Sequence, residues 1–311
     1  MEFHHIPVML EECIAYLNLR PDGTYVDGTL GGAGHSSAIA AKLGRGGRLI
    51  GIDQDAEAVR AAGERLAPFG TQVTIVQDNF KNIDTILDNL DIDKIDGALL
   101  DLGVSSHQLD EAERGFSYMA DAPLDMRMDQ NAEKSAYEVV NGYSEQQLAD
   151  IIFRYGEEKW AKRIAQFIAE RRKEKPLETT MELVAVIRAA IPKGARLEGG
   201  NPAKRTFQAI RIEVNGELAI LRGALDAFAD RLRAGGRLAV ITFHSLEDRI
   251  VKDTFRDLAQ GCICPKEFPV CVCGRKPRAK ILTKKPVTAS AEELRHNSRA
   301  KSAKLRVIEM L

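Results

Sequence analysis

The chain has 311 residues, of which 44% are hydrophobic, and it carries 44 lysines and arginines against 45 aspartates and glutamates. This length accommodates one large α/β domain with an insertion, or two modest domains. A formal net charge of −1 excludes a globally positive field, so local patches must hold any polyanionic partner. The C-terminal region is such a patch, because eleven lysines and arginines lie between Arg275 and Arg306 against only Glu292 and Glu293.

The start of the chain lacks the features of an exported or membrane-bound protein. No charged segment followed by an apolar core is present, and no run approaches the roughly 18 apolar residues that span a membrane. We therefore expect a cytoplasmic protein with no membrane partner. In that reducing compartment the five cysteines are not expected to form a disulfide framework.

The first hundred residues alternate short β-rich runs with helical runs, which is typical of a parallel sheet covered by helices on both faces. The expected strands are 25–27, 48–53, 73–77, 98–101 and, after a long interruption, 237–243. The first three intervening helices are expected to begin near His35, Ala56 and Asn82. The pattern therefore predicts an α/β fold.

Between residues 115 and 204 the strand pattern disappears, and apolar residues such as Leu148, Ile151 and Ile152 recur at helical spacing. Glycine and proline interrupt segment 192–202, which we expect to be a loop. The sequence thus predicts a discontinuous sheet domain of residues 1–114 and 205–311. It predicts a helical domain inserted at residues 115–204.

A glycine-rich turn, DGTLGGAGHS at 27–36, follows the first expected strand and opens a helix. Glycines at such a turn let the backbone approach a nucleotide-like ligand. Asp53 closes the second strand about twenty residues further on, where a carboxylate can accept both ribose hydroxyls of an adenosine. The turn departs from the Gly-x-Gly-x-x-Gly/Ala pattern, which disfavours NAD, and a purely structural corner remains the alternative.

The third expected strand ends in QDNF at 77–80, where a polar side chain and an aromatic ring could meet an adenine. A strand end with a core phenylalanine is the alternative. The carboxyl ends of parallel strands meet at one edge of the sheet, where open α/β folds bind ligands. The three strand ends together therefore favour a nucleotide-like cofactor.

Longer motifs point to one family. They include DLGVSSHQLD at 101–110, PLDMRMD at 123–129, RTFQAIR at 205–211 and FHSLEDR at 243–249, with further blocks at 4–9, 113–117 and 155–158. Together they resemble the bacterial 16S rRNA (cytosine-N4)-methyltransferase family over nearly the whole chain. The resemblance implies a class I S-adenosylmethionine-dependent methyltransferase, with a Rossmann-like parallel sheet and an inserted α-helical domain for substrate recognition.

The resemblance implies methyl transfer from S-adenosylmethionine to the exocyclic N4 of a cytidine in the decoding (P-site) region of 16S rRNA. The small ribosomal subunit is then the partner. It also implies a cofactor site lined by Ala33, Gly34, His35, Asp53, Phe80, Asp101 and Gln108. Two alternatives stay open: a methyltransferase of another RNA or of a protein amine, and a nucleotide-binding ribosome-assembly factor without catalysis. The oligomeric state is open, a homodimer included.

Asp101 is the candidate catalytic residue. Cytosine N4 is a weak nucleophile because its lone pair is delocalised into the ring, and an acceptor for its N–H bonds would favour attack. The resemblance makes the same residue a cofactor ligand, so both roles stay open. Segment 101–104 lacks the Asn/Asp-Pro-Pro-aromatic loop of many amino-methyltransferases, which leaves the base-stacking residue unidentified. His35 and His244 are alternative bases, although we expect a structural role for His244.

Two further groups of side chains are candidates for binding. Phosphate contacts are expected from Lys204, Arg205, Arg211, Arg295 and Arg299, unless these form ordinary solvated faces. Four cysteines are candidate ligands of a single tetrahedral zinc ion: Cys262, Cys264, Cys271 and Cys273. Against zinc, one intervening residue in each Cys-x-Cys pair is fewer than structural sites usually have.

Overall fold

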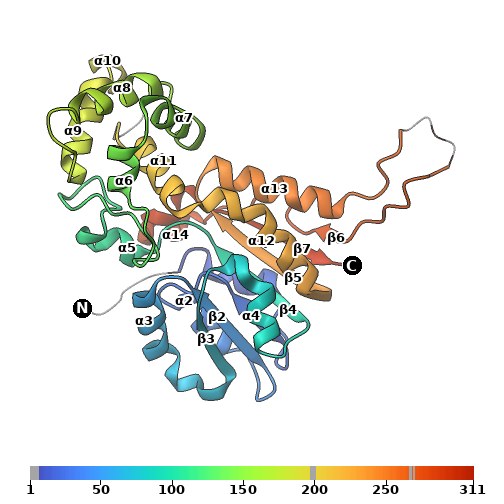
Figure 1. Ribbon diagram of the computed structural model, residues 1–311. Helices are drawn as coiled ribbons and strands as arrows, with labels where there is room; N and C mark the ends of the chain where they lie inside the picture. Colours follow the sequence, from blue (N-terminus) through green and yellow to red (C-terminus); the bar gives the residue numbers. More distant parts are fainter. Residues whose placement is uncertain (1–6, 197–200, 266–267, 269) are drawn as a thin grey trace. The chain divides into compact units, whose positions relative to one another are not determined.

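The computed structural model describes residues 7–196, 201–265, 268 and 270–311. The chain forms two compact units, a sheet unit of residues 1–103 and 219–311 and a helical unit of residues 104–218 (Figure 1). The helical unit thus extends beyond the expected range 115–204 at both ends. Helix α11 (Lys204–Asn215), expected in the sheet domain, belongs to it because residues such as Phe207 lie in the helical core.

Part of the sequence pattern falls outside the described residues. The motif at 4–9 is described only from Pro7 onward. The expected loop at 192–202 contains the short helix α10 (Lys193–Arg196), and its residues 197–200 lie outside the description.

Seven strands form one sheet in the order β3-β2-β1-β4-β5-β7-β6. Their bounds are β1 (Thr24–Asp27), β2 (Arg48–Asp53), β3 (Val73–Gln77), β4 (Ile95–Asp101), β5 (Leu232–Thr242), β6 (Ala279–Ile281) and β7 (Lys304–Met310). Strands β1 to β5 pair in parallel, whereas β7 runs antiparallel to both β5 and β6. The sheet is therefore mixed: the expected Rossmann-like parallel part carries two C-terminal antiparallel strands that the sequence reading missed.

Strand β7 was not predicted, because its charged residues were interpreted as part of a basic surface. Lys304 and Arg306 counted as part of a basic surface, yet Arg306 is only 8% exposed. Its guanidinium donates to both carboxylate oxygens of Asp248, at 2.6 and 3.1 Å, and Nζ of Lys304 lies 3.4 Å from the same carboxylate. A buried charge is tolerated when it is paired in this way. These two cations are therefore engaged inside the sheet unit.

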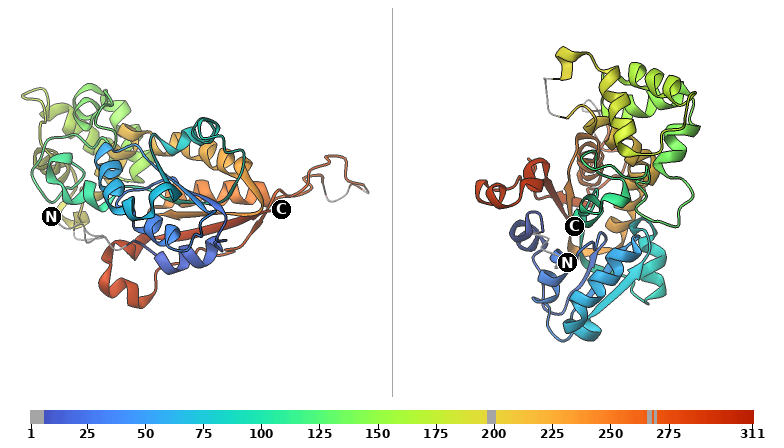
Figure 2. Two further views of the ribbon diagram at one scale, coloured as in Figure 1. Left: turned by 90° about the horizontal axis from the view of Figure 1, so that it is seen from below. Right: turned by 90° about the vertical axis from the view of Figure 1, so that its left-hand side faces the viewer.

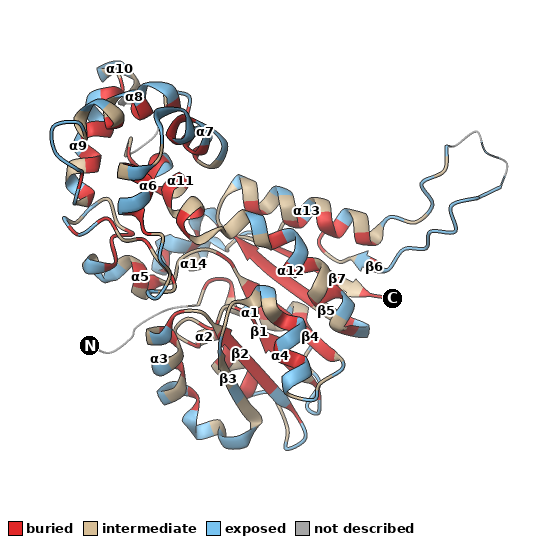
Figure 3. Cartoon of the chain, viewed as in Figure 1, coloured by how far each residue is buried: buried red, intermediate tan, exposed pale blue. Residues whose placement is uncertain are grey.

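Helices cover both faces of the sheet (Figure 2). On one face pack α4 (Ile83–Asn89), α12 (Glu217–Arg231) and α13 (Ser245–Ala259), and on the other α1 (Leu10–Leu17), α2 (Gly34–Ala40) and α3 (Ala56–Leu66). Side chains alternate along a strand, so Val26 and Leu100 face the first group while Tyr25 and Leu99 face the second. Both faces are buried, which explains the continuous apolar strands and the largely buried sheet in Figure 3. The remaining short elements are η1 (Ala67–Gln72), η2 (Phe80–Asn82), α14 (Ala291–His296) and η4 (Ser298–Ser302).

The helical unit has its own core. Its elements are α5 (Ser106–Asp110), η3 (Ala112–Arg114), α6 (Ala136–Gly142), α7 (Glu145–Gly156), α8 (Ala161–Arg171), α9 (Thr180–Ala190), α10 and α11. Capping boxes at Ser135, Ser144 and Thr179 start α6, α7 and α9, because each side chain accepts an otherwise unpaired backbone N–H. No helix within the described ranges is both long and apolar enough to cross a membrane.

Candidate functional site at the carboxyl edge of the sheet

The glycine-rich turn between β1 and α2 is hydrogen-bonded to both neighbouring strands. The backbone N–H of Gly28 donates to the carbonyl of Leu99, and that of Leu30 donates to the carbonyl of Ile52, each at 2.9 Å. A Cβ on Gly28 would lie 2.4 Å from Cδ2 of Leu100. A Cβ on Gly34 would lie equally close to Cγ of Pro7. Packing within the chain therefore requires these two glycines, whether or not a ligand binds.

Three aspartates stand at the carboxyl ends of β1, β2 and β4. Asp27, which the sequence reading did not single out, is 1% exposed and accepts hydrogen bonds from the Ser36 hydroxyl at 2.7 Å and the Thr29 backbone N–H at 3.2 Å. Burial raises the pKa of this carboxyl. The Thr29 hydroxyl in turn accepts the backbone N–H of Asp101 at 2.6 Å. Asp27 thus holds the turn that positions the other two carboxylates.

Asp53 ends β2 beneath the turn. One carboxylate oxygen accepts the backbone N–H of Gly31 at 2.8 Å, and the other accepts that of Asp55 at 2.9 Å. Burial raises the pKa of Asp53 to about 6, against the lowering effect of these two hydrogen bonds. The group is therefore ionised at neutral pH. Each oxygen keeps a second lone pair, so both can still accept a hydrogen bond from a ligand.

Asp101 ends β4 and has an unused acceptor atom. Its side chain is 20% exposed, yet Oδ1 is buried and has no hydrogen-bond partner among the residues that the structure describes. Burial raises the pKa of Asp101 well above its usual range, and the charges of Asp27 and Glu247 raise it further. A buried, unpaired carboxylate oxygen is costly. Such an atom at a ligand-binding edge marks a functional group.

His35 lies beside Asp101 at the start of α2. Its Nε2 lies 2.9 Å from the carbonyl oxygen of Val8, and its Nδ1 lies 3.9 Å from Oδ2 of Asp101. Burial lowers the pKa of His35 to about 4, so the ring is neutral at physiological pH. A neutral ring that donates from Nε2 to Val8 keeps the lone pair of Nδ1 on the side of Asp101. Two proton acceptors therefore stand together at this point of the edge.

The other predicted cofactor residues divide between the two units. Ala33 is the N-cap of α2 with φ of 56° and Gly34 follows it, so both belong to the turn. Phe80, three residues after the end of β3, is half-buried against the core that also contains Val26. Gln108 belongs to the helical unit, where its side-chain oxygen accepts the backbone N–H of Ser105 in the capping box of α5. The assignment of Gln108 to the cofactor site stays a prediction.

His244 has a structural place in the sheet unit. It is the N-cap of α13, and its Nε2 lies 3.1 Å from Oε1 of Glu247. Oε2 of Glu247 accepts the backbone N–H of Phe243 at 2.8 Å. The capping contact agrees with the structural role expected for His244.

The predicted phosphate-binding cations differ in their surroundings. Lys204 and Arg205 are exposed at the start of α11, where Nη1 of Arg205 donates to the carbonyl of Glu157 at 3.1 Å. Arg295 in α14 and Arg299 in η4 are exposed on the sheet unit. By contrast, Arg211 is 16% exposed.

Arg211 forms two hydrogen bonds of 2.8 Å with the carboxylate of Glu217. The ion pair lies entirely within the helical unit. The structure therefore gives Arg211 an internal partner that the sequence could not reveal.

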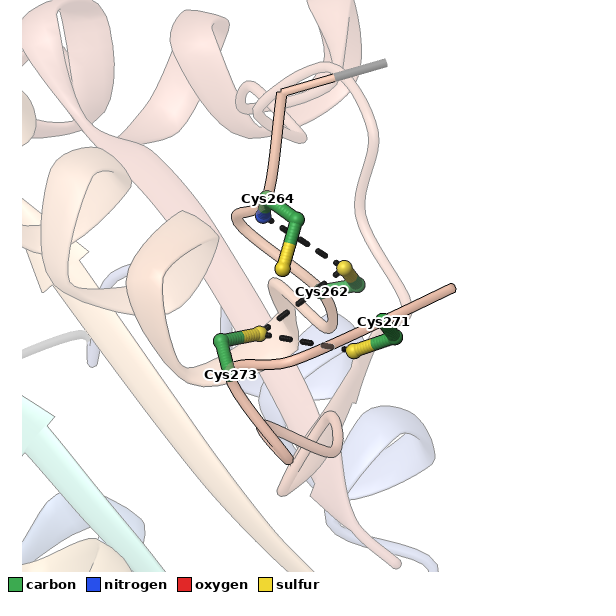
Figure 4. Close-up of side chains that lie close together, drawn as sticks. All are labelled: Cys262, Cys264, Cys271 and Cys273. Carbon is green, nitrogen blue, oxygen red and sulfur yellow. Dashed lines mark hydrogen bonds between the residues drawn. The ribbon is translucent and has the colours of Figure 1, made fainter. Parts of the chain in front are cut away.

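The four clustered cysteines come together between α13 and β6 (Figure 4). The four Sγ atoms all lie within 4.8 Å of one another. Sγ of Cys273 is 3.6 Å from that of Cys271 and 3.8 Å from that of Cys262. The two Cys-x-Cys pairs therefore converge despite their short spacing.

Comparisons with known proteins agree with one another. A model of the MraW methylase family matches residues 2–311. The chain is 58% identical over 311 residues to the Ribosomal RNA small subunit methyltransferase H of Lachnospira eligens, covering all of this chain and 99% of that protein. Proteins of the same name from Heliobacterium modesticaldum and Clostridium botulinum are 59% identical over 312 residues and 60% identical over 307 residues. The former match covers 100% of both chains, the latter 99% of both.

Proposed function

Because the chain belongs to the MraW methylase family along residues 2–311, we propose that it transfers a methyl group from S-adenosylmethionine to the exocyclic N4 of a specific cytidine in the decoding (P-site) region of 16S rRNA. Its relatives carry the name of a small-subunit ribosomal RNA methyltransferase. The observation that carries the chemistry is Oδ1 of Asp101, which is buried without a hydrogen-bond partner in the described part of the chain and belongs to the carboxylate beside Nδ1 of His35. We place the reaction in the cytoplasm, where ribosomal subunits are assembled.

The proposed cofactor site uses residues of the sheet unit. Asp53 accepts the two ribose hydroxyls on lone pairs that the backbone N–H groups of Gly31 and Asp55 leave free. Phe80, which follows the neighbouring strand, supplies an apolar surface for the adenine. Ala33, Gly34 and His35 form the turn against which the rest of the cofactor lies. Support for this arrangement comes from the common position of these residues at the carboxyl edge.

The reaction depends chiefly on positioning. The sulfonium methyl group of S-adenosylmethionine is already electrophilic, so the protein must align N4 with the S–CH₃ bond and exclude water. We propose that Asp101 accepts a hydrogen bond from the N4 amino group, which localises the nitrogen lone pair for attack. As the N–C bond forms, the S–CH₃ bond would break with its electron pair going to sulfur, so that S-adenosylhomocysteine leaves. The extra proton on N4 then passes to Asp101 or to water. Cofactor binding by Asp101 is the alternative role.

Radiolabelled methyl transfer tests the proposed function. Small subunits isolated from cells that lack this enzyme are incubated with the protein and labelled S-adenosylmethionine, and their RNA is digested to nucleosides. We expect the label in N4-methylcytidine. Label in another nucleoside would keep the reaction class and reject the substrate, and label in a subunit protein would favour a protein methyltransferase. No label on subunits or on naked 16S rRNA would favour the non-catalytic assembly factor.

We propose that Lys204 and Arg205 contact phosphates of the substrate. The double variant Lys204→Ala/Arg205→Ala is expected to weaken 16S rRNA binding at low salt and to reduce the slope of log affinity against log salt by about one unit per cation. Filter binding over a salt series measures both quantities. The matched control Lys162→Ala/Lys173→Ala removes two exposed cations of the same unit. Equal losses in the two variants would reject a specific contact.

A further inference from the structure

The described residues of segment 260–278, which joins α13 to β6, form no hydrophobic core of their own. Among its described residues none is buried, and Ile263, Val270 and Val272 are 55%, 70% and 73% exposed. In Figure 1 and in the left view of Figure 2 the described parts of the segment extend beyond the end of α13, and Figure 3 shows these parts almost entirely exposed. Apolar burial therefore cannot hold them in one conformation. Short segments of this kind are usually stabilised by a disulfide or a metal ion.

The four sulfur atoms have the dimensions of a metal site. A tetrahedral zinc with Zn–S bonds of about 2.3 Å requires S···S separations of about 3.8 Å. Sγ of Cys273 lies 3.6 and 3.8 Å from Sγ of Cys271 and Cys262, and no two of the four atoms are more than 4.8 Å apart. Small movements of these four side chains would complete the tetrahedron. The cluster lies within the sheet unit, in the segment after the C-terminal end of α13, whereas the three aspartates stand at the ends of β1, β2 and β4.

Backbone N–H groups support negative charge on the sulfurs. The N–H of Cys264 points to Sγ of Cys262 at 3.4 Å, within one pair. Between the pairs, the N–H of Ile263 points to Sγ of Cys273 at 3.5 Å, and the N–H of Val272 points to Sγ of Cys264 at 3.3 Å. Donors of this kind orient and stabilise metal-bound thiolates. The two segments thus donate to each other's sulfurs, which explains how pairs with one intervening residue converge.

We propose that Cys262, Cys264, Cys271 and Cys273 bind one Zn²⁺ in a closed tetrathiolate site that fixes segments 262–264 and 271–273 relative to each other. Four sulfur ligands in tetrahedral arrangement favour zinc over harder divalent cations. Because protein ligands fill all four positions, the site is structural and leaves no position for a reacting group. Binding releases the thiol protons to solvent. The site goes beyond methyl transfer, and its failure would leave the proposed function unaffected.

Metal analysis of the full-length protein tests the site. Protein purified without chelator and under reducing conditions is expected to contain one zinc per chain by mass spectrometry. After removal of the metal, titration with Co²⁺ should give the visible absorption and sulfur-to-cobalt charge-transfer bands of a tetrahedral thiolate site. Cys262→Ser and Cys273→Ser should each lose the stoichiometric metal. The matched control Val272→Ser places the same side chain between two ligands and should keep it.

Limited digestion with trypsin gives a second readout that does not depend on methyl transfer. Arg275 and Arg278 are exposed cleavage sites beside the cluster, and Zn²⁺ should protect them in the wild type and in Val272→Ser. Reduced wild-type protein that takes up neither Zn²⁺ nor Co²⁺ would overturn the proposal. So would a stoichiometric disulfide within the cluster in protein kept from air, or iron in place of zinc. Because the cobalt titration uses the wild type, the test stands even if a serine variant misfolds.

Discussion

Asp101→Asn is expected to lower the rate of methyl transfer at saturating cofactor by about two to three orders of magnitude, the usual effect of losing a positioned proton acceptor. The affinity for S-adenosylmethionine should change by less than about tenfold, because the proposed partner of Asp101 is the cytosine amine. Asparagine is nearly isosteric but neutral. The substitution removes a negative charge that is unfavourable in this buried position, as the raised pKa of Asp101 indicates. The ligand-free variant should therefore melt at the same temperature as the wild type or higher.

The pH dependence of the rate gives a second signature of this role. Asp101 accepts a hydrogen bond from the N4 amino group best when its carboxyl group is ionised. The wild-type rate should therefore rise with pH as this carboxyl loses its proton. The pKa of Asp101 is raised above its usual range, which moves this rise toward higher pH. Asp101→Asn has no such ionisation and should lose that limb of the profile. Single-turnover measurements over a pH series record both profiles.

Asp96→Asn serves as the control on the same strand. Asp96 lies near the amino end of β4, is 5% exposed, and accepts the backbone N–H of Thr24 at 2.7 Å. Asparagine keeps one acceptor oxygen but removes the negative charge that pairs with Arg20, so thermal stability should fall while the folded protein keeps its turnover. If Asp101→Asn instead weakens cofactor binding as much as it slows the reaction, Asp101 is a cofactor ligand. Calorimetric titration with S-adenosylmethionine separates these results.

The sequence predicted the sheet unit best where its signals are local. Residues 48–53 and 73–77 appear as the strands β2 and β3 with the expected bounds. The apolar run of β2 is typical of a strand buried on both faces, whereas β3 is a half-exposed edge strand that its β-branched residues indicate. Asp53 and Asp101 could be placed at one edge of the sheet because the carboxyl ends of parallel strands meet there. Asp27 was not predicted as a site residue, because its role depends on the hydrogen bond that it accepts from Ser36, nine residues later.

The features that the sequence reading missed depend on partners distant along the chain. Strand β7 was read as a basic surface because nothing local indicates that Asp248 neutralises Arg306. The four cysteines, by contrast, were predicted as one candidate zinc site, although the single residue within each Cys-x-Cys pair counted against it. The spacing alone carries no information on how segments 262–264 and 271–273 face each other. Tertiary pairing of charged and sulfur side chains has no period that a sequence pattern can reveal.

Asp53→Asn is expected to weaken binding of S-adenosylmethionine by about two orders of magnitude. The proposed contacts are two hydrogen bonds from ribose hydroxyls to an ionised group, and each bond to a charged group contributes about 1.5–3 kcal/mol. The Asp53 carboxylate accepts hydrogen bonds from the backbone N–H groups of Gly31 and Asp55. Asparagine keeps one acceptor oxygen, so its NH₂ group would face one of these two N–H donors. Turnover at saturating cofactor should fall much less. Calorimetric titration gives the affinity, and initial rates at high cofactor concentration give the turnover.

The same contact predicts a pH dependence of cofactor binding. Burial raises the pKa of Asp53 to about 6 in the ligand-free protein, and only the ionised carboxylate accepts both hydroxyls. The wild-type affinity should therefore be constant above about pH 7 and fall by about tenfold per pH unit below the pKa. Asp53→Asn should bind weakly without this transition.

Asp55→Asn is the matched control, because asparagine is an equally good N-cap for α3 and the Asp55 side chain accepts the backbone N–H of Glu57 at 3.0 Å. It should bind the cofactor as the wild type does. The midpoint of the transition should move slightly to lower pH, because the charge of Asp55 contributes to the raised pKa of Asp53. Wild-type affinity that stays constant down to about pH 5, together with an unchanged affinity in Asp53→Asn, would remove Asp53 from the ribose site. The glycine turn would then be a structural corner, as packing around Gly28 and Gly34 already permits.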